Sequence, residues 1–165
     1  MLIISDTTPI ISLIKAKQID LLQKMFGSVV IPNAVYNELT VNKNFGSEIE
    51  KLKECSFVKV DVVVNESSVN ILRNVTGLDA GESEAIVMVE EKKADLLLMD
   101  EHKGRQVAKK MGINITGTIG IILQAFDEKL LSKEDVEQCL VLLKECNIRI
   151  SESLCNKVYE HIESM

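Results

Sequence analysis

Acidic residues at the ends of apolar runs are the side chains in this sequence whose position best suits chemistry. Asp6 directly follows an apolar run at residues 2–5, and Asp100 follows a second run at residues 95–99. The carboxyl ends of neighbouring parallel strands meet at one edge of a sheet, which is where such sheets bind their ligands. If both runs are adjacent strands, the two carboxylates lie together at that edge.

A purely structural interpretation of each aspartate remains open. Asp6 could cap a helix, but Thr8 followed by Pro9 already supplies an N-cap and a proline at the first helical position, which favours a functional Asp6. Asp100 could cap a helix that starts at Glu101, and taken alone this is the better interpretation. Only the pairing with Asp6 shifts the balance towards a functional Asp100.

Glutamates on two expected helices join these candidates. Glu38 lies at the edge of the apolar face of the helix expected at 33–39, where a charge is costly to bury unless it is paired or bound to metal. An ordinary surface glutamate is an equally good interpretation of Glu38. Asp79 and Glu82 form a capping-box pattern, so Glu82 has a structural role. Glu84 has no such role in the sequence and precedes residues that are apolar all round the helix. We therefore predict Glu84 as the functional acid, with Glu82 in reserve.

The remaining polar residues give weaker signals. No Ser–His or Cys–His pattern indicates a catalytic nucleophile. The four cysteines lack the C-x-x-C spacing of a zinc site and are expected to be reduced thiols. Lys103 and Arg105 follow Asp100 on one expected helix. We interpret them as part of a solvated face, with contact to substrate phosphates as the alternative.

The elements that must position these side chains alternate along the chain. Short β-branched runs are followed by helical stretches, which predicts an α/β fold with a mainly parallel sheet of about five strands, covered on both faces. The expected strands are 2–5, 28–31, 57–63, 95–99 and 114–116. The expected helices are 9–16, 19–25, 33–39, 48–54, 82–92, 101–111, 119–128, 133–146 and 152–163.

Length and composition limit the classes of protein to consider. The 165 residues favour one domain, in which the helices of about 133–165 form an appendage on one side of the sheet. A net charge of −6 counts against sequence-independent binding of phosphates, although a cluster of metal-binding acids explains part of it. No apolar run is long enough to span a bilayer, and residues 2–4 are strand-like without a basic leader. We therefore expect a cytoplasmic protein that does not enter the membrane.

Four segments resemble, in order, the motifs of the PIN-domain family, and within it the prokaryotic branch near the VapC toxins. They are ISDTTPI at 4–10, IPNAVYNEL at 31–39, LDAGESEAI at 78–86 and LLMDEHKGR at 97–105. The resemblance runs from about residue 2 to about residue 127. It implies a three-layer α/β/α fold with a parallel sheet, a divalent-metal site built from three to five acids, and cleavage of RNA.

Carried onto this sequence, the resemblance assigns the family's acids to Asp6, Glu38, Glu84 and Asp100. Thr7 matches a family Ser/Thr that orients the metal ligands. Two features depart from the family. A glutamate occupies the third acidic position, where aspartate is usual, and Lys103 lies near the place where typical toxins carry a further acid.

The function implied is that of an Mg²⁺- or Mn²⁺-dependent endoribonuclease. All four acids offer hard oxygen ligands, which select these ions over zinc. We expect Asp6 and Asp100 to hold the first ion and Glu38 and Glu84 to complete the site. The protein would be the toxin of a toxin–antitoxin pair, with RNA as its substrate, an antitoxin protein as its partner and a homodimer as a further assembly. The alternative is a catalytically silent PIN-like module that binds RNA or a partner protein.

Overall fold

The computed structural model describes all 165 residues and contains one sheet of five parallel strands in the order β3-β2-β1-β4-β5. Each strand overlaps a run that the sequence predicted as a strand. The bounds are β1 Ile3–Ser5, β2 Val29–Pro32, β3 Val58–Asp61, β4 Leu96–Leu98 and β5 Ile115–Thr116. The chain moves outward from β1 through β2 to β3 and then returns to the other side of β1. The topological switch point therefore lies between β1 and β4.

Ten α-helices and one short 3₁₀ helix connect and cover these strands. Nine of the α-helices overlap helices that the sequence predicted. The bounds are α1 Thr7–Lys15, α2 Asp20–Phe26, α3 Asn33–Val41, α4 Gly46–Lys53, α5 Glu66–Thr76, α6 Ala80–Lys92, α7 His102–Lys110, α8 Thr118–Asp127, α9 Lys133–Glu145 and α10 Glu152–Glu163, with the 3₁₀ helix at Lys43–Phe45.

The helix α5 is an element that the sequence analysis missed. Asn65 caps it by accepting a hydrogen bond from the Ser68 N–H, and Gly77 ends it in the left-handed conformation, with φ at 74°. Both signals are local and could have been recognised. The start of α1 was also predicted wrongly. The helix begins at Thr7, and Asp6 rather than Thr8 occupies the N-cap position.

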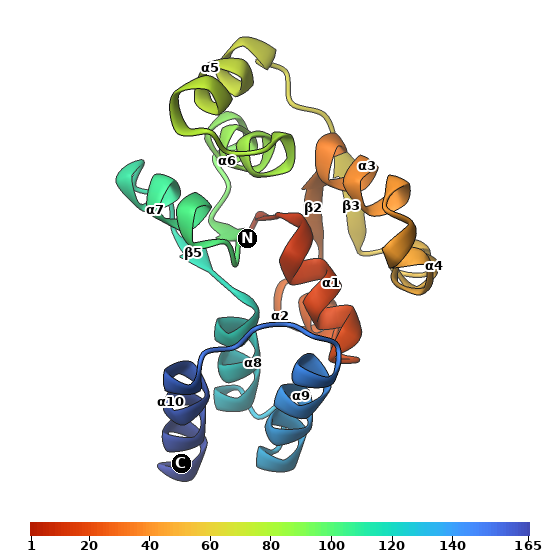
Figure 1. Cartoon of the computed structure of the whole chain (residues 1–165), viewed down its shortest axis with the longest axis vertical. Coiled ribbons are helices and arrows are strands. Elements are labelled where there is room, and N and C mark those ends of the chain that lie inside the picture. Colours follow the sequence, from red (N-terminus) through yellow and green to blue (C-terminus); the bar gives the residue numbers. More distant parts are fainter.

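The helices form two layers because side chains alternate along each strand. Ile3 and Leu98 belong to one core, which they share with α1–α4 and α8–α10. Ile4 and Leu97 belong to a second core on the other face of the sheet, built with α5, α6 and α7. Figure 1 shows the two groups of helices on opposite sides of the central strands. The three-layer α/β/α fold expected from the sequence is confirmed.

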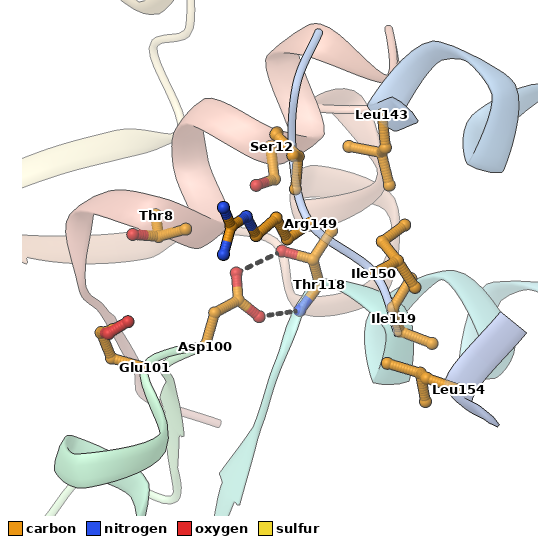
Figure 2. Close-up of a pocket in the computed structure, with 11 residues that line it drawn as sticks. Thr8, Ser12, Asp100, Glu101, Thr118, Ile119, Leu143, Arg149, Ile150 and Leu154 are labelled. Carbon is orange, nitrogen blue, oxygen red and sulfur yellow. Dashed lines mark hydrogen bonds between the residues drawn. The ribbon is translucent and has the colours of Figure 1, made fainter. Parts of the chain in front are cut away.

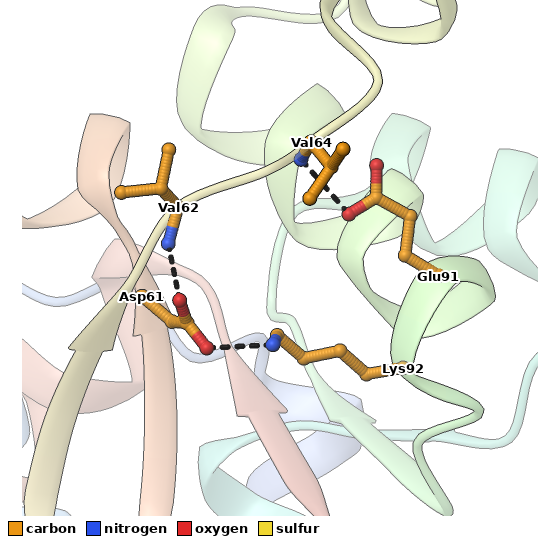
Figure 3. A network of polar contacts seen from close by, with 5 residues as sticks. All are labelled: Asp61, Val62, Val64, Glu91 and Lys92. Atoms are coloured by element: carbon orange, nitrogen blue, oxygen red, sulfur yellow. Dashed lines mark hydrogen bonds and ion pairs between the residues drawn. The ribbon is translucent and has the colours of Figure 1, made fainter.

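The connection from β3 to α5 is tied to the C-terminal half of α6. Asp61 accepts a hydrogen bond from its neighbour Val62 and forms an ion pair with Lys92, with an N···O distance of 2.6 Å (Figure 3). The backbone N–H of Val64 donates to Glu91 in the same region. The ion pair with Lys92 lowers the pKa of Asp61. These contacts hold the connection against α6 at the side of the sheet away from α8–α10.

The last two helices contribute to the larger core. Leu140 of α9 and Ile162 of α10 are both buried in it, and α10 packs beside α8 (Figure 1). Among all the helices, none combines the length and the apolar composition needed to cross a bilayer.

Candidate functional site

Asp6 occupies the carboxyl end of the central strand, as the sequence predicted. Its backbone N–H donates to the Leu98 carbonyl of β4 at 2.9 Å, and the residue is only 4% exposed. Burial raises the pKa of its carboxyl from 3.8 to about 7, partly offset by the Thr7 backbone N–H. The neighbouring negative charges of Asp79, Glu82 and Glu38 contribute, after burial, to the same rise in the pKa of Asp6.

Glu38 reaches the same place from α3. Its Oε2 accepts a hydrogen bond from the Thr7 hydroxyl at 2.9 Å, so Thr7 fixes the orientation of this carboxylate. Gly81, in the first turn of α6, faces this pair. A Cβ at position 81 would lie 3.2 Å from Glu38 Oε2 and 3.5 Å from Asp6 Oδ1. Two of the four predicted acids therefore converge on one point, and a methyl group at position 81 would push the Glu38 carboxylate aside by a few tenths of an ångström.

Glu82 is the α6 acid that belongs to this group. It forms the predicted capping box with Asp79: the Glu82 N–H donates to Asp79 Oδ1 at 2.8 Å, and the Asp79 N–H donates to Glu82 Oε2 at 2.9 Å. Glu82 is nevertheless 8% exposed. Its pKa is raised first by burial and then by nearby charges, among them Asp79 and Glu38, and the capping hydrogen bond only partly offsets the rise. Glu82 is therefore both a helix-capping residue and a buried acid.

Glu84 has a structural role that the sequence did not reveal. Its Oε2 accepts a hydrogen bond from the Ala34 backbone N–H at 2.9 Å, which satisfies a free donor at the start of α3. The premise for preferring Glu84, that it lacked a structural role, is wrong. The acid that couples to Asp6 from this helix is Glu82, the reserve candidate. Whether either residue binds a metal ion remains a prediction.

Asp100 lies at the same edge of the sheet but turns towards α8. Its two carboxylate oxygens accept hydrogen bonds from the Thr118 backbone N–H at 2.7 Å and from the Thr118 hydroxyl at 2.6 Å (Figure 2). It therefore caps α8, and not the helix that follows it, where Glu101 occupies the N-cap position without a side-chain bond. Strands β1 and β4 place Asp6 and Asp100 at neighbouring strand ends, but the two carboxylates face different helices.

The two basic residues considered as phosphate contacts lie on either side of this edge. Arg105 Nη1 donates to the Met99 carbonyl at 2.8 Å and borders Asp100, so it supports the end of β4. The Lys103 ammonium lies beside Gly77, 2.9 Å from the position that a Cβ would take there. It comes from the start of α7 and is exposed to solvent.

The acids fit a divalent cation by their chemistry. Asp6 is buried among three other carboxylates, and no Lys, Arg or His side chain forms an ion pair with it. A bound cation would relieve this repulsion, and hard oxygen donors favour Mg²⁺ or Mn²⁺. As the side chains stand, however, no group of three or more Asp, Glu, His or Cys residues is arranged around a common metal position.

A pocket of about 400 Å³ opens beside Asp100 and contains residues that the sequence analysis did not single out. Thr8 and Ser12 line it from α1, and Arg149 lines it from the connection between α9 and α10 (Figure 2). Nothing in the spacing of Arg149 marks it in the sequence, because only the packing of the last two helices brings it to this edge.

The sequence matches a known protein family. A family model described as a PIN domain matches residues 2–164, nearly the whole chain. No curated protein matches the sequence. The matched range includes α9 and α10, which lie beyond the part of the chain over which the motifs were recognised.

Proposed function

Because this chain belongs to the PIN-domain family, we propose that it is a metal-dependent endoribonuclease with Asp6 at the centre of its metal site. PIN domains are generally nucleases and typically use divalent ions, so a nuclease-type hydrolase is the coarse assignment. The observation that carries the finer proposal is the Asp6 carboxylate at the end of the central strand, which is buried among Glu38, Asp79 and Glu82 and has no ion pair. Such a cluster is costly without a cation.

The side chains would divide the work at this edge of the sheet. Asp6 and Glu38 would hold Mg²⁺ or Mn²⁺, with Glu82 in place of the predicted Glu84 and with Asp100 on the β4 side. The Thr7 hydroxyl fixes the Glu38 carboxylate. A bound divalent ion supplies a Lewis acid that lowers the pKa of water and neutralises phosphate charge. Water would hydrolyse the phosphodiester bond, leaving a 5′-phosphate and a 3′-hydroxyl, so no nucleophilic side chain is needed.

Cleavage of single-stranded RNA by the purified chain tests this proposal. We expect cleavage with Mg²⁺ or Mn²⁺, none in EDTA, and none by Asp6→Asn with either ion. Asp20→Asn is the matched control, because Asp20 is an exposed acid at the start of α2. Undiminished cleavage in EDTA, or full activity of Asp6→Asn, would contradict the proposal.

A toxin role in a toxin–antitoxin pair is the biological extension of this activity, supported by the motifs shared with the VapC-like branch. Induced expression should then arrest growth, and Asp6→Asn should abolish the arrest while Asp20→Asn does not. If the product of a neighbouring gene relieves the growth arrest, that product is the antitoxin. Arrest that persists with Asp6→Asn would rule out nuclease toxicity.

A specific observation favours the silent-module alternative. Glu38, Glu84 and Asp100 each accept at least one hydrogen bond that holds the fold together, and no metal-binding group is preformed. A silent module would bind RNA or a partner protein without needing Asp6. Binding of Mn²⁺, measured as a rise in melting temperature that Asp6→Asn removes, separates the nuclease from this alternative.

A further inference from the structure

The pocket beside Asp100 is polar at one end and apolar at the other. It is lined by Thr8, Ser12, Asp100, Glu101, Thr118, Ile119, Leu143, Ile148, Arg149, Ile150 and Leu154. The connection between α9 and α10 forms one wall, and the N-terminal end of α8 forms another (Figures 1 and 2). Its volume of about 400 Å³ falls within the range of pockets that bind small ligands.

Arg149 is the one basic side chain that lines this pocket; it is exposed to solvent at the rim and forms no ion pair within the fold. The guanidinium points towards Asp100 and Thr8 (Figure 2), yet it makes no hydrogen bond or ion pair with any residue. Asp100 is already satisfied by the N–H and hydroxyl of Thr118. An arginine fork with five free donors is suited to a planar or tetrahedral oxyanion, and in particular to phosphate.

Ser12 gives independent evidence that this end of the pocket is built for a polar ligand. The residue is 1% exposed, and its hydroxyl has no hydrogen-bond partner in the fold. Buried polar groups are nearly always paired, so a hydroxyl without a partner that lines a pocket indicates a missing ligand. Thr8 lies one helical turn away on the same helix and adds a second, solvent-exposed hydroxyl to the lining.

The opposite end of the pocket is aliphatic. Ile119, Ile150 and Leu154 line it, and no aromatic residue or amide is present there. A nucleobase could pack against such a wall through its flat face. The wall offers no donor or acceptor pattern that would distinguish one base from another.

We propose that this pocket binds one nucleotide of the RNA strand next to the acidic site, with its phosphate on Arg149 and the hydroxyls of Ser12 and Thr8, and its base against the aliphatic wall. The inference rests on the proposed function, because it names how the same site holds its substrate. Asp100 and Glu101 oppose an anion here, so the phosphate depends on Arg149. With an aliphatic wall, the site should accept all four bases with similar affinity.

Calorimetric titration of adenosine 5′-monophosphate and of adenosine into the full chain tests the subsite without catalysis. The monophosphate should bind more tightly than adenosine. Arg149→Met should weaken binding of the monophosphate by about 10-fold or more and leave adenosine unchanged, as expected for loss of a charged hydrogen bond. Ser12→Ala should weaken the monophosphate less. Lys144→Met is the matched control, since it removes an exposed charge from α9 outside the pocket.

RNA cleavage by the same variants separates this inference from the nuclease proposal. Arg149→Met should raise KM while kcat is largely retained. Arg149-dependent binding of the monophosphate by a chain that cleaves no RNA would support the subsite and overturn the nuclease. The subsite would be overturned if Arg149→Met cleaved RNA with an unchanged KM and bound the monophosphate as tightly as wild type. The nuclease proposal would still stand if that cleavage depended on the metal ion.

Discussion

The replacement of Asp6 by asparagine should stabilise the metal-free protein above neutral pH. The pKa of Asp6 rises from 3.8 to about 7 in the folded chain, mainly through burial. An acid whose pKa is raised by folding favours the folded state fully below its unfolded pKa, and this contribution is lost as pH rises through the folded pKa. Asparagine has a similar shape and no charge to bury, so the variant should escape the loss.

The magnitude follows from the pKa. Each tenfold change in proton affinity is worth about 1.4 kcal/mol, so ionising Asp6 in the folded chain costs up to about 4 kcal/mol at pH 8. Asp6→Asn should therefore be more stable than wild type by an amount that approaches this figure above pH 7. At pH 4 the two proteins should differ by less than about 1 kcal/mol.

Urea unfolding between pH 4 and pH 9 in EDTA measures this difference directly. Titrating groups that do not couple to Asp6 cancel when the two free energies of unfolding are subtracted, so the difference reports Asp6 together with the acids coupled to it. Asp20→Asn, an exposed substitution, should follow the wild-type pH profile. Parallel profiles of wild type and Asp6→Asn across the whole range would refute the reasoning, since they would mean that Asp6 is hydrated or already paired. With Mn²⁺ added, wild type should gain more stability than Asp6→Asn.

Two further predictions concern α6. Glu84→Ala should lower the free energy of unfolding by about 1 kcal/mol, because the Ala34 N–H loses its acceptor, while cleavage by the folded protein persists. Glu82→Gln keeps a capping oxygen and should lower the cleavage rate on the order of 100-fold. Reversed effects of the two variants would restore Glu84 as the functional acid. Gly81→Ala should change the metal-free stability by less than about 1 kcal/mol. It should reduce the rise in melting temperature that Mn²⁺ causes, because the methyl group would crowd Glu38. An unchanged rise would mean that the metal binds elsewhere.

The sheet and its edge could be predicted from the sequence because the signals are local. Short β-branched or apolar runs marked each strand, and their alternation with helical stretches indicated a parallel α/β fold. The predicted strands placed Asp6 and Asp100 at strand ends, and the structure shows that these two strands, β1 and β4, are neighbours. The capping box of Asp79 and Glu82 was equally visible, since both of its hydrogen bonds span three residues.

The missed features depend on packing between distant segments. The bond between Glu84 and the Ala34 N–H joins residues 50 apart in sequence and exists only because α3 lies beside α6. Arg149 comes to the site through the packing of α9 and α10, which no motif records. In both cases the residue's spacing on its own helix or loop says nothing about the surface that it meets.

The structural and functional interpretations of these acids prove to be compatible, because a carboxylate has two oxygens. The three glutamates each commit one oxygen, Oε2, to a hydrogen bond that fixes the side chain, and leave Oε1 without a partner: Glu38, Glu82 and Glu84. A carboxylate side chain held in this way loses little conformational entropy when it binds a cation. Asp100 differs, since Thr118 engages both of its oxygens. A metal ion that recruits Asp100 must therefore share an oxygen with the start of α8 or displace one of its two bonds.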